Sequence, residues 1–173
     1  KVGPVRAVAG VNQVLSLAYD GSRLELLVGS STPNQDCCSA AEMVGVSASG
    51  AGGRPQQIVG GLAGATQGQL ITLAGGQMRA AGGTEGGVWF APSDRRDRFG
   101  AQHLLSDKGQ EPVSMSAAGL GGQSSIVAWT AGRGVIGAIA PRSIDYATGS
   151  RRQAPRHARL ALTVPAGHRI DQV

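Results

Sequence analysis

Short apolar runs separated by glycine-containing turns constrain this sequence more than any other feature. The 28 glycines are scattered without a three-residue period, which disfavours collagen, coiled coils and long helical bundles. Each run has about four to six residues, many of them β-branched, and this length and composition favour strands over helices. The sequence therefore predicts an all-β fold, with one short helix expected at residues 39–44.

The apolar runs pair into hairpins that recur along the chain. Asp20-Gly21 joins two runs, and this dipeptide supplies the positive φ that a tight turn needs. We expect equivalent turns at Gly75-Gly76 and at Gly132-Arg133-Gly134, the latter joining residues 126–129 to residues 135–139. Downstream of each hairpin, two further apolar segments are separated by a polar loop: 44–47 with 55–59, 88–91 with 101–105, and 144–147 with 155–160.

A four-stranded unit that repeats every 45–55 residues or so is the pattern of a β-propeller blade, and such units bury their faces by stacking on one another. The sequence therefore predicts a propeller segment of about three antiparallel blades. They are residues 1–53 with an insertion at 30–41, residues 54–108, and residues 109–173 including a C-terminal strand. Propellers typically have about four to eight blades. Either further blades lie outside this chain, or the ring closes by assembly, or the fold is a β-sandwich.

Three segments carry a resemblance to a known class of repeats. They are Phe99-Gly100-Ala101-Gln102-His103-Leu104-Leu105-Ser106, residues 113–118, and Ile126-Val127-Ala128-Trp129 followed by a glycine turn. This pattern resembles the β-propeller repeats of bacterial extracytoplasmic proteins, and it extends best over residues 54–163. The resemblance implies the propeller architecture and an extracytoplasmic or secreted location. It implies no particular reaction.

Motifs for cofactor or metal binding are weak. Residues 132–137 match G-x-G-x-x-G, but a dinucleotide site needs this loop to open a helix, and Pro141 and the flanking strand patterns favour a turn. The adjacent Cys37 and Cys38 do not have the spacing of a zinc site. These two thiols could be reduced, bridged to each other or paired with another chain. We therefore predict no metal and no cofactor.

Catalytic signatures are equally sparse. His103 and His157 occupy similar places in successive repeats, where we expect solvated outer strands, and the acidic residues are scattered. A serine–histidine–aspartate site assembled in space stays open, since such sites are defined by geometry. Trp89, Phe90 and Trp129 lie inside predicted strands, where they are expected to be core residues. Enzymatic activity is therefore uncertain, and a non-catalytic role is favoured.

Arginine loops are the most informative charge feature of a chain with a net charge of +5. Equivalent loops of adjacent blades would lie on one rim, so their charges would merge into a basic patch for an acidic glycan, a phosphate polymer or an acidic protein. The alternative is a solvated loop without a ligand. Without interleaved aromatic residues, nucleic acid is disfavoured as a partner. The predicted rim consists of Arg95, Arg96 and Arg98 in one loop and Arg151, Arg152 and Arg156 in its counterpart one repeat later.

The sequence thus predicts a non-catalytic β-propeller scaffold of an exported bacterial protein, which binds or interacts through its loops and whose ligand is unknown. Two uncharged stretches, residues 55–78 and 112–132, are too rich in glycine, glutamine and serine to be transmembrane helices. One alternative is part of a propeller-type hydrolase or lyase acting on glycans. The other is a structural β-sandwich subunit of a surface assembly.

Overall fold

A computed structural model describes residues 13–30, 40–47, 52–53, 56–58, 62, 64–93, 98–131, 144–150, 153–160 and 173. Over these residues the chain is all-β, with three antiparallel sheets of four strands each and no helix. This confirms the all-β prediction. Within the same residues, no helix is long and apolar enough to cross a membrane.

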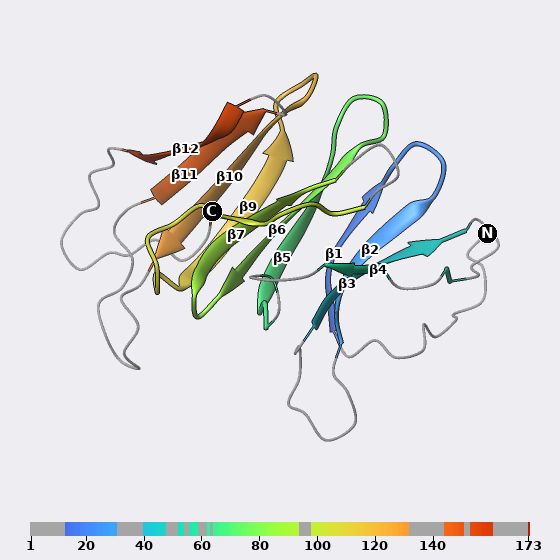
Figure 1. The fold of residues 1–173 in the computed structure, drawn as a ribbon, viewed down its shortest axis with the longest axis horizontal. Coiled ribbons are helices and arrows are strands. Elements are labelled where there is room, and N and C mark those ends of the chain that lie inside the picture. The colour runs from blue at the N-terminus through green and yellow to red at the C-terminus, as the bar shows by residue number, and fades with distance from the viewer. Residues whose placement is uncertain are drawn as a thin grey trace.

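Each sheet is a meander whose strands follow chain order, and none of the three closes on itself. Figure 1 shows the sheets side by side, with the second between the other two. Sheet I contains β1 (Gln13–Tyr19), β2 (Leu24–Ser30), β3 (Ala40–Val46) and β4 (Gln56–Ile58). Sheet II contains β5 (Gln67–Thr72), β6 (Met78–Thr84), β7 (Gly87–Pro92) and β8 (His103–Leu104). Sheet III contains β9 (Pro112–Gly119), β10 (Ser124–Ala131), β11 (Ile144–Ser150) and β12 (Gln153–Leu160).

The segments expected downstream of each hairpin correspond to strands β3, β4, β7, β8, β11 and β12. The expectation of a helix at residues 39–44 is wrong, because its described part belongs to β3, which pairs antiparallel with β2. Ala41 and Met43 are two residues apart and both lie in the core between sheets I and II. Their burial follows the two-residue period of a strand.

The third hairpin turn lies at Gly121-Gly122, between β9 and β10. Both glycines have positive φ, 92° and 55°, and the Leu120 N–H donates to the carbonyl oxygen of Ser124 at 3.0 Å. Strand β10 pairs with β9 on one edge and with β11 on the other. The predicted hairpin at Gly132-Arg133-Gly134 is therefore wrong, because β10 has no edge left for residues 135–139, which lie outside the described residues.

The chain passes from one sheet to the next at two places. Strand β4 pairs with β3, so sheet I runs on to Ile58, past the boundary expected at 53/54. The division between sheets II and III falls between Leu104 and Pro112, where the boundary at 108/109 was expected. The expected insertion at 30–41 and the pair Cys37-Cys38 lie outside the described residues, apart from the strand ends that flank them.

The two faces of each sheet are named here by their position relative to its first hairpin turn. We call the face that carries the residue pair next to this turn the leading face, and the opposite one the trailing face. Successive residues of a strand alternate between the two faces. The defining pairs are Tyr19–Leu24 in sheet I, Thr72–Met78 in sheet II and Gly119–Ser125 in sheet III.

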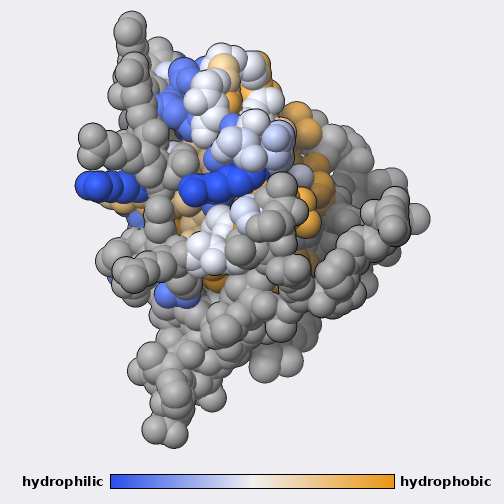
Figure 2. Space-filling view, turned by 90° about the vertical axis from the view of Figure 1, so that its right-hand side faces the viewer, coloured by the Kyte–Doolittle hydropathy of each residue, from blue (hydrophilic) through white to orange (hydrophobic). Residues whose placement is uncertain are grey.

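All three sheets stack in the same orientation. The trailing face of sheet I packs on the leading face of sheet II, where Leu27 and Met78 share one core. The trailing face of sheet II packs on the leading face of sheet III, where Phe90, Val127 and Trp129 share a second core. The leading face of sheet I is consequently turned away from sheet II, toward the end of the molecule seen in Figure 2.

The first strands of the three sheets, β1, β5 and β9, are neighbours in space. The Leu70 N–H donates to Ser16 Oγ and Thr72 Oγ1 donates to the carbonyl oxygen of Tyr19, both at 3.0 Å. Between sheets II and III, Gln67 Nε2 donates to the carbonyl oxygen of Val113 at 2.9 Å. Hydrogen bonds between first strands therefore accompany the apolar contacts between sheet faces.

Strand β6 leaves no room for side chains at two successive positions. A Cβ atom on Gly82 would lie 2.2 Å from Cδ2 of Leu62, which precedes sheet II, and a Cβ atom on Gly83 would lie 2.1 Å from Cγ of Pro112 in sheet III. Since Gly82 and Gly83 face opposite sides of β6, the strand is closely packed on both faces.

We predict that Gly83→Ala lowers the free energy of unfolding by about 1–3 kcal/mol, because a rigid proline ring occupies the space of the added methyl group. The matched control is Gly100→Ala, whose Cβ would meet its nearest atom, the Pro92 carbonyl oxygen, at 3.7 Å. Chemical denaturation of both variants measures the difference. Equal stability of the two variants would contradict the close packing of β6 against β9.

Candidate functional site

The predicted basic rim is only partly within the described residues. Arg98 is exposed in the connection between β7 and β8. Arg156 is exposed in β12, opposite Thr148 of β11, so its expected placement in a loop is wrong. This position is on the trailing face of sheet III. The other members, Arg95, Arg96, Arg151 and Arg152, lie outside the described residues.

Both histidines expected on outer strands are found there, His103 on β8 and His157 on β12. His103 is exposed. His157 also has a protein contact, because its ring stacks on Trp129 with the ring centroids 5.4 Å apart and the planes inclined by 26°. Trp129 and Phe90 are buried core residues, as expected, whereas Trp89 is half-buried.

Asp145, on β11, is the centre of the main polar cluster of sheet III. Its carboxylate is fully buried. Arg159 Nε donates to Oδ1 at 2.7 Å and Arg159 Nη2 donates to Oδ2 at 3.2 Å. Gln110 Nε2, from the connection between β8 and β9, donates to Oδ2 at 3.0 Å. His157 Nε2 lies 3.7 Å from Oδ1. Strand register brings these groups together, because Asp145 is paired with Arg159 and the adjacent pair on the same face is Ala147 with His157.

This environment keeps the Asp145 carboxylate ionised. Burial alone would raise its pKa, but the hydrogen bonds from Arg159 and Gln110, with the positive charge of Arg159, lower the pKa below its ordinary value of 3.8. The same contact raises the pKa of Arg159. The cluster is thus a charge-assisted link between β11, β12 and the segment that enters sheet III.

The arrangement of Asp145 and His157 differs from that of a catalytic dyad. In such a dyad the carboxylate accepts a hydrogen bond from the imidazole and so orients the ring. Here the 3.7 Å separation is longer than a hydrogen bond, and Arg159 and Gln110 hold the carboxylate oxygens. The pair also lies on the last two strands of its sheet, away from the first strands. Its geometry supports a structural role.

A second polar cluster joins sheet II to sheet III. Arg79 of β6 is almost fully buried, with 4% of its surface exposed. Its Nη1 donates to Ser125 Oγ at 2.7 Å and to the carbonyl oxygen of Gly149 at 3.2 Å, while its Nη2 donates to the carbonyl oxygen of Gln123. The guanidinium also lies 5.5 Å from the centroid of the Phe90 ring. Three neutral acceptors and one aromatic face therefore surround a buried cation.

Burial lowers the pKa of Arg79, yet an arginine side chain remains charged in proteins. Its acceptors belong to β10, β11 and the turn before β10, all in sheet III. The side chain therefore connects the trailing face of sheet II to the leading face of sheet III by hydrogen bonds. This contact helps to fix how the two sheets stack.

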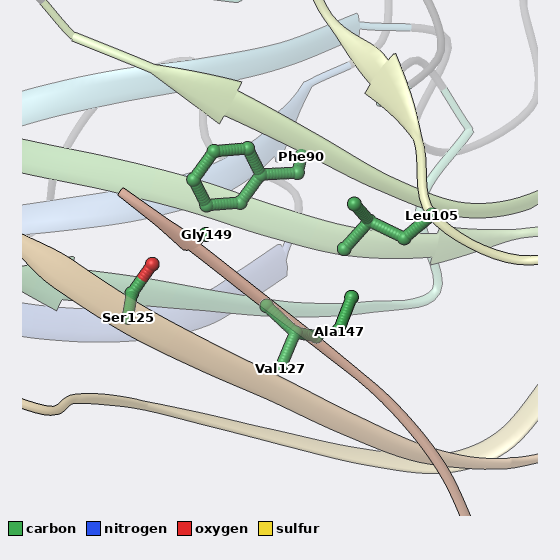
Figure 3. Close-up of a pocket in the computed structure, with 6 residues that line it drawn as sticks. All are labelled: Phe90, Leu105, Ser125, Val127, Ala147 and Gly149. Carbon is green, nitrogen blue, oxygen red and sulfur yellow. The ribbon is translucent and has the colours of Figure 1, made fainter. Parts of the chain in front are cut away.

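A small cavity lies beside the Arg79 cluster, between sheets II and III (Figure 3). Its enclosed volume is about 10 Å³, which is about the least that holds one water molecule. Pockets for drug-sized ligands are larger, about 300–1,000 Å³. The lining is apolar except for Ser125, whose hydroxyl already accepts from Arg79. The cavity therefore supplies no separate ligand site. It is lined by Phe90, Leu105, Ser125, Val127, Ala147 and Gly149.

Sequence reasoning did not assign a role to Arg79, Gln110 or Asp145. A usable signal existed for Arg79, which is the one charged residue in a run of small residues from Met78 to Thr84. A charge in such a run indicates a specific partner, because an unpaired charge is costly to bury. Asp145 and Gln110 carry no comparable signal, since their contact depends on the placement of the segment before β9.

Comparisons with protein-family models, with curated proteins and with solved structures each found no match. In the part of the chain that the structure describes, no group of three or more histidine, cysteine, aspartate or glutamate residues is placed to hold a metal ion. The two polar clusters and the exposed arginines are therefore the features on which a functional interpretation rests.

We predict that Asp145→Asn lowers the free energy of unfolding at neutral pH by about 1–3 kcal/mol, because it removes the charge that Arg159 and Gln110 stabilise. The pKa of Asp145 is lowered by folding, so its stabilisation is present above the ordinary value of 3.8 and is lost as the pH falls through the lower folded value. Denaturation at a series of pH values should therefore show the wild type and the variant converging in acid.

The control for this prediction is Glu85→Gln, which removes the same charge from an exposed residue and should change stability by less than about 0.5 kcal/mol. If the difference between wild type and Asp145→Asn were the same in acid as at neutral pH, Asp145 would not be an ionised structural anchor.

We also predict that Arg79→Met lowers the free energy of unfolding by about 1–3 kcal/mol, because the acceptors in sheet III lose their donor in a buried site. Lys108→Met, at an exposed turn residue, is the control for the loss of one positive charge. Thermal unfolding monitored by circular dichroism gives the comparison. A variant as stable as the control would show that Arg79 does not hold the two sheets together.

Proposed function

We propose that this chain is a non-catalytic scaffold of the β-propeller type, from an exported bacterial protein, which holds an acidic partner on exposed arginines. The observation that carries the proposal is the repeated stacking of three four-stranded meanders, each with its trailing face on the leading face of the next. A four-stranded antiparallel meander is the unit of a propeller blade. A β-sandwich, by contrast, consists of two packed sheets.

Neighbouring first strands further support the propeller type, because the blades of a propeller are arranged around a central axis. Strands β1, β5 and β9 are adjacent, and Ser16 and Gln67 make hydrogen bonds between them. The resemblance of the repeats to extracytoplasmic propeller proteins supports export. Loops and edge strands on such a rigid scaffold are the usual place for binding.

The acidic partner is inferred from the distribution of charge. Two acidic side chains, Glu25 and Asp145, are fully buried and bind Arg23 and Arg159. These carboxylates are inaccessible to an incoming cation. Arg156, by contrast, is exposed at the surface, and arginine suits carboxylate and sulfate groups because its guanidinium can donate two parallel hydrogen bonds.

The hydrolase alternative has one observation in its favour, the proximity of Asp145 and His157. The contacts of Asp145 with Arg159 and Gln110 account for the same carboxylate without any reaction. Hydrolysis of a glycoside or an ester would overturn the non-catalytic proposal if His157→Ala abolished it while thermal unfolding stayed unchanged.

We predict that the chain binds heparin, as an acidic glycan, or poly-glutamate, as an acidic polypeptide, with an affinity that falls as salt is added. A variant with glutamine in place of Arg95, Arg96, Arg98, Arg151, Arg152 and Arg156 should bind at least roughly tenfold more weakly, since each exposed ion pair is worth about 0.2–1 kcal/mol. Isothermal titration calorimetry with each polymer measures the loss and tells the two partner classes apart.

The matched control is Lys108→Gln, which removes an exposed charge outside the predicted rim and should weaken binding only slightly. Equal binding by the six-residue variant and the wild type, or binding that does not respond to salt, would contradict the assignment of these arginines to a ligand surface.

A further inference from the structure

Apolar side chains of β1 are exposed on the leading face of sheet I, the one leading face in the described stack that no other described sheet covers. Val28 of β2 and Val44 of β3, on the same face, are buried, so the exposed part of this face lies over β1. Leu17 is 64% exposed and Tyr19 is 60% exposed. Leu17 belongs to the third residue pair from the hairpin turn, and its counterpart in sheet II is Leu70. Leu70 is only 6% exposed because sheet I covers it. Equivalent leucines therefore differ in burial according to whether a preceding sheet is present.

The trailing face of sheet III has the corresponding property at the other end of the stack. Ala118 is exposed, whereas its counterpart in sheet II, Ile71, is 3% exposed and lies in the core with sheet III. Leu160, also on this trailing face, is 45% exposed. The two ends of the stack thus present a leading face and a trailing face, the two kinds of face that pack together twice within the chain.

Polar groups on the two ends are also complementary. Ser116 of sheet III is in the fourth pair from its turn, as Ser16 is in sheet I. Ser16 Oγ accepts the Leu70 N–H across the interface between sheets I and II, so Ser116 is placed to accept the Leu17 N–H of a second copy.

We propose that two copies of this chain associate head to tail, with the exposed β1 part of the leading face of sheet I in each copy packed on β9, at the trailing face of sheet III, in the other. Three sheets from each copy then form a ring of six sheets with two identical interfaces. This arrangement covers Leu17 and Tyr19 in both copies. The proposal rests on the stacking order of the sheets and is independent of which acidic partner binds.

The contact between Tyr19 and the other copy follows from an interface that the chain already contains. Gly119 occupies the position of Tyr19 in sheet III. A Cβ atom on it would lie 3.2 Å from the Thr72 carbonyl oxygen, 3.7 Å from Cδ2 of Leu73 and 3.9 Å from Cγ2 of Ile71. Ile71 corresponds to Ala118 in sheet III. Tyr19 of one copy is therefore expected beside Ala118 of the other.

The mass of the full 173-residue chain in solution tests the proposal. Analytical ultracentrifugation should give twice the 17.5 kDa of one chain, with dissociation at low concentration. Tyr19→Glu and Ala118→Lys should each raise the dissociation constant at least about tenfold, because each buries an unpaired charge in the interface. Both positions are exposed in the single chain, so circular dichroism and thermal unfolding of the monomer should be retained.

Mixing the two single variants is the most discriminating measurement. A mixed dimer has one unaltered interface and one in which the introduced glutamate would meet the introduced lysine, so mixing equal amounts should restore association. A wild-type chain that stays monomeric, or a dimer that neither substitution weakens, would overturn the proposal. Heparin binding is a separate readout, because Tyr19→Glu leaves every arginine of the predicted rim in place.

Discussion

The close packing on both faces of strand β6 is the constraint on which the rest of this structure depends. Each sheet contributes few large side chains, so the two apolar cores form only if the backbones approach closely. Gly82 and Gly83 permit this approach, because Leu62 and Pro112 occupy the volume in which their Cβ atoms would lie. The alanines of the same strand are fully buried as well. The cores around Leu27 and Trp129 thus lie on opposite sides of a strand that consists mostly of small residues.

The buried charged side chains Arg79 and Asp145 form hydrogen bonds that connect strands and sheets. Arg79 donates from sheet II to acceptors in sheet III, and Asp145 links β11, β12 and the segment before β9. A buried charge is tolerated only where hydrogen bonds replace its hydration. Each cluster is therefore committed to local partners and has little capacity left for a substrate. The binding that we propose would instead use exposed charges, such as Arg156 on β12.

The fold class and most strands were predictable because runs such as that of β10 combine β-branched residues with glycine turns. Strand β6 was not marked by any apolar run, since its small residues are selected by the neighbouring sheets and not by local propensity. The third hairpin was misplaced because glycine turns flank β10 on both sides, and only its pairing with β9 and β11 decides between them. The cluster around Asp145 was missed for a related reason. Its members meet only after the register of β11 and β12 is set.

The small residues of β6 also bear on how the chain reaches its folded state. Glycine loses more conformational entropy on ordering than any other residue. Two adjacent glycines therefore make it unfavourable for this strand to form alone. Its favourable contacts come from both neighbouring sheets, through Met78 on one face and Ala81 on the other. Sheet II should therefore be only marginally stable by itself. Because sheet II depends on contacts with both of its neighbours, the three sheets would then fold and unfold as one cooperative unit.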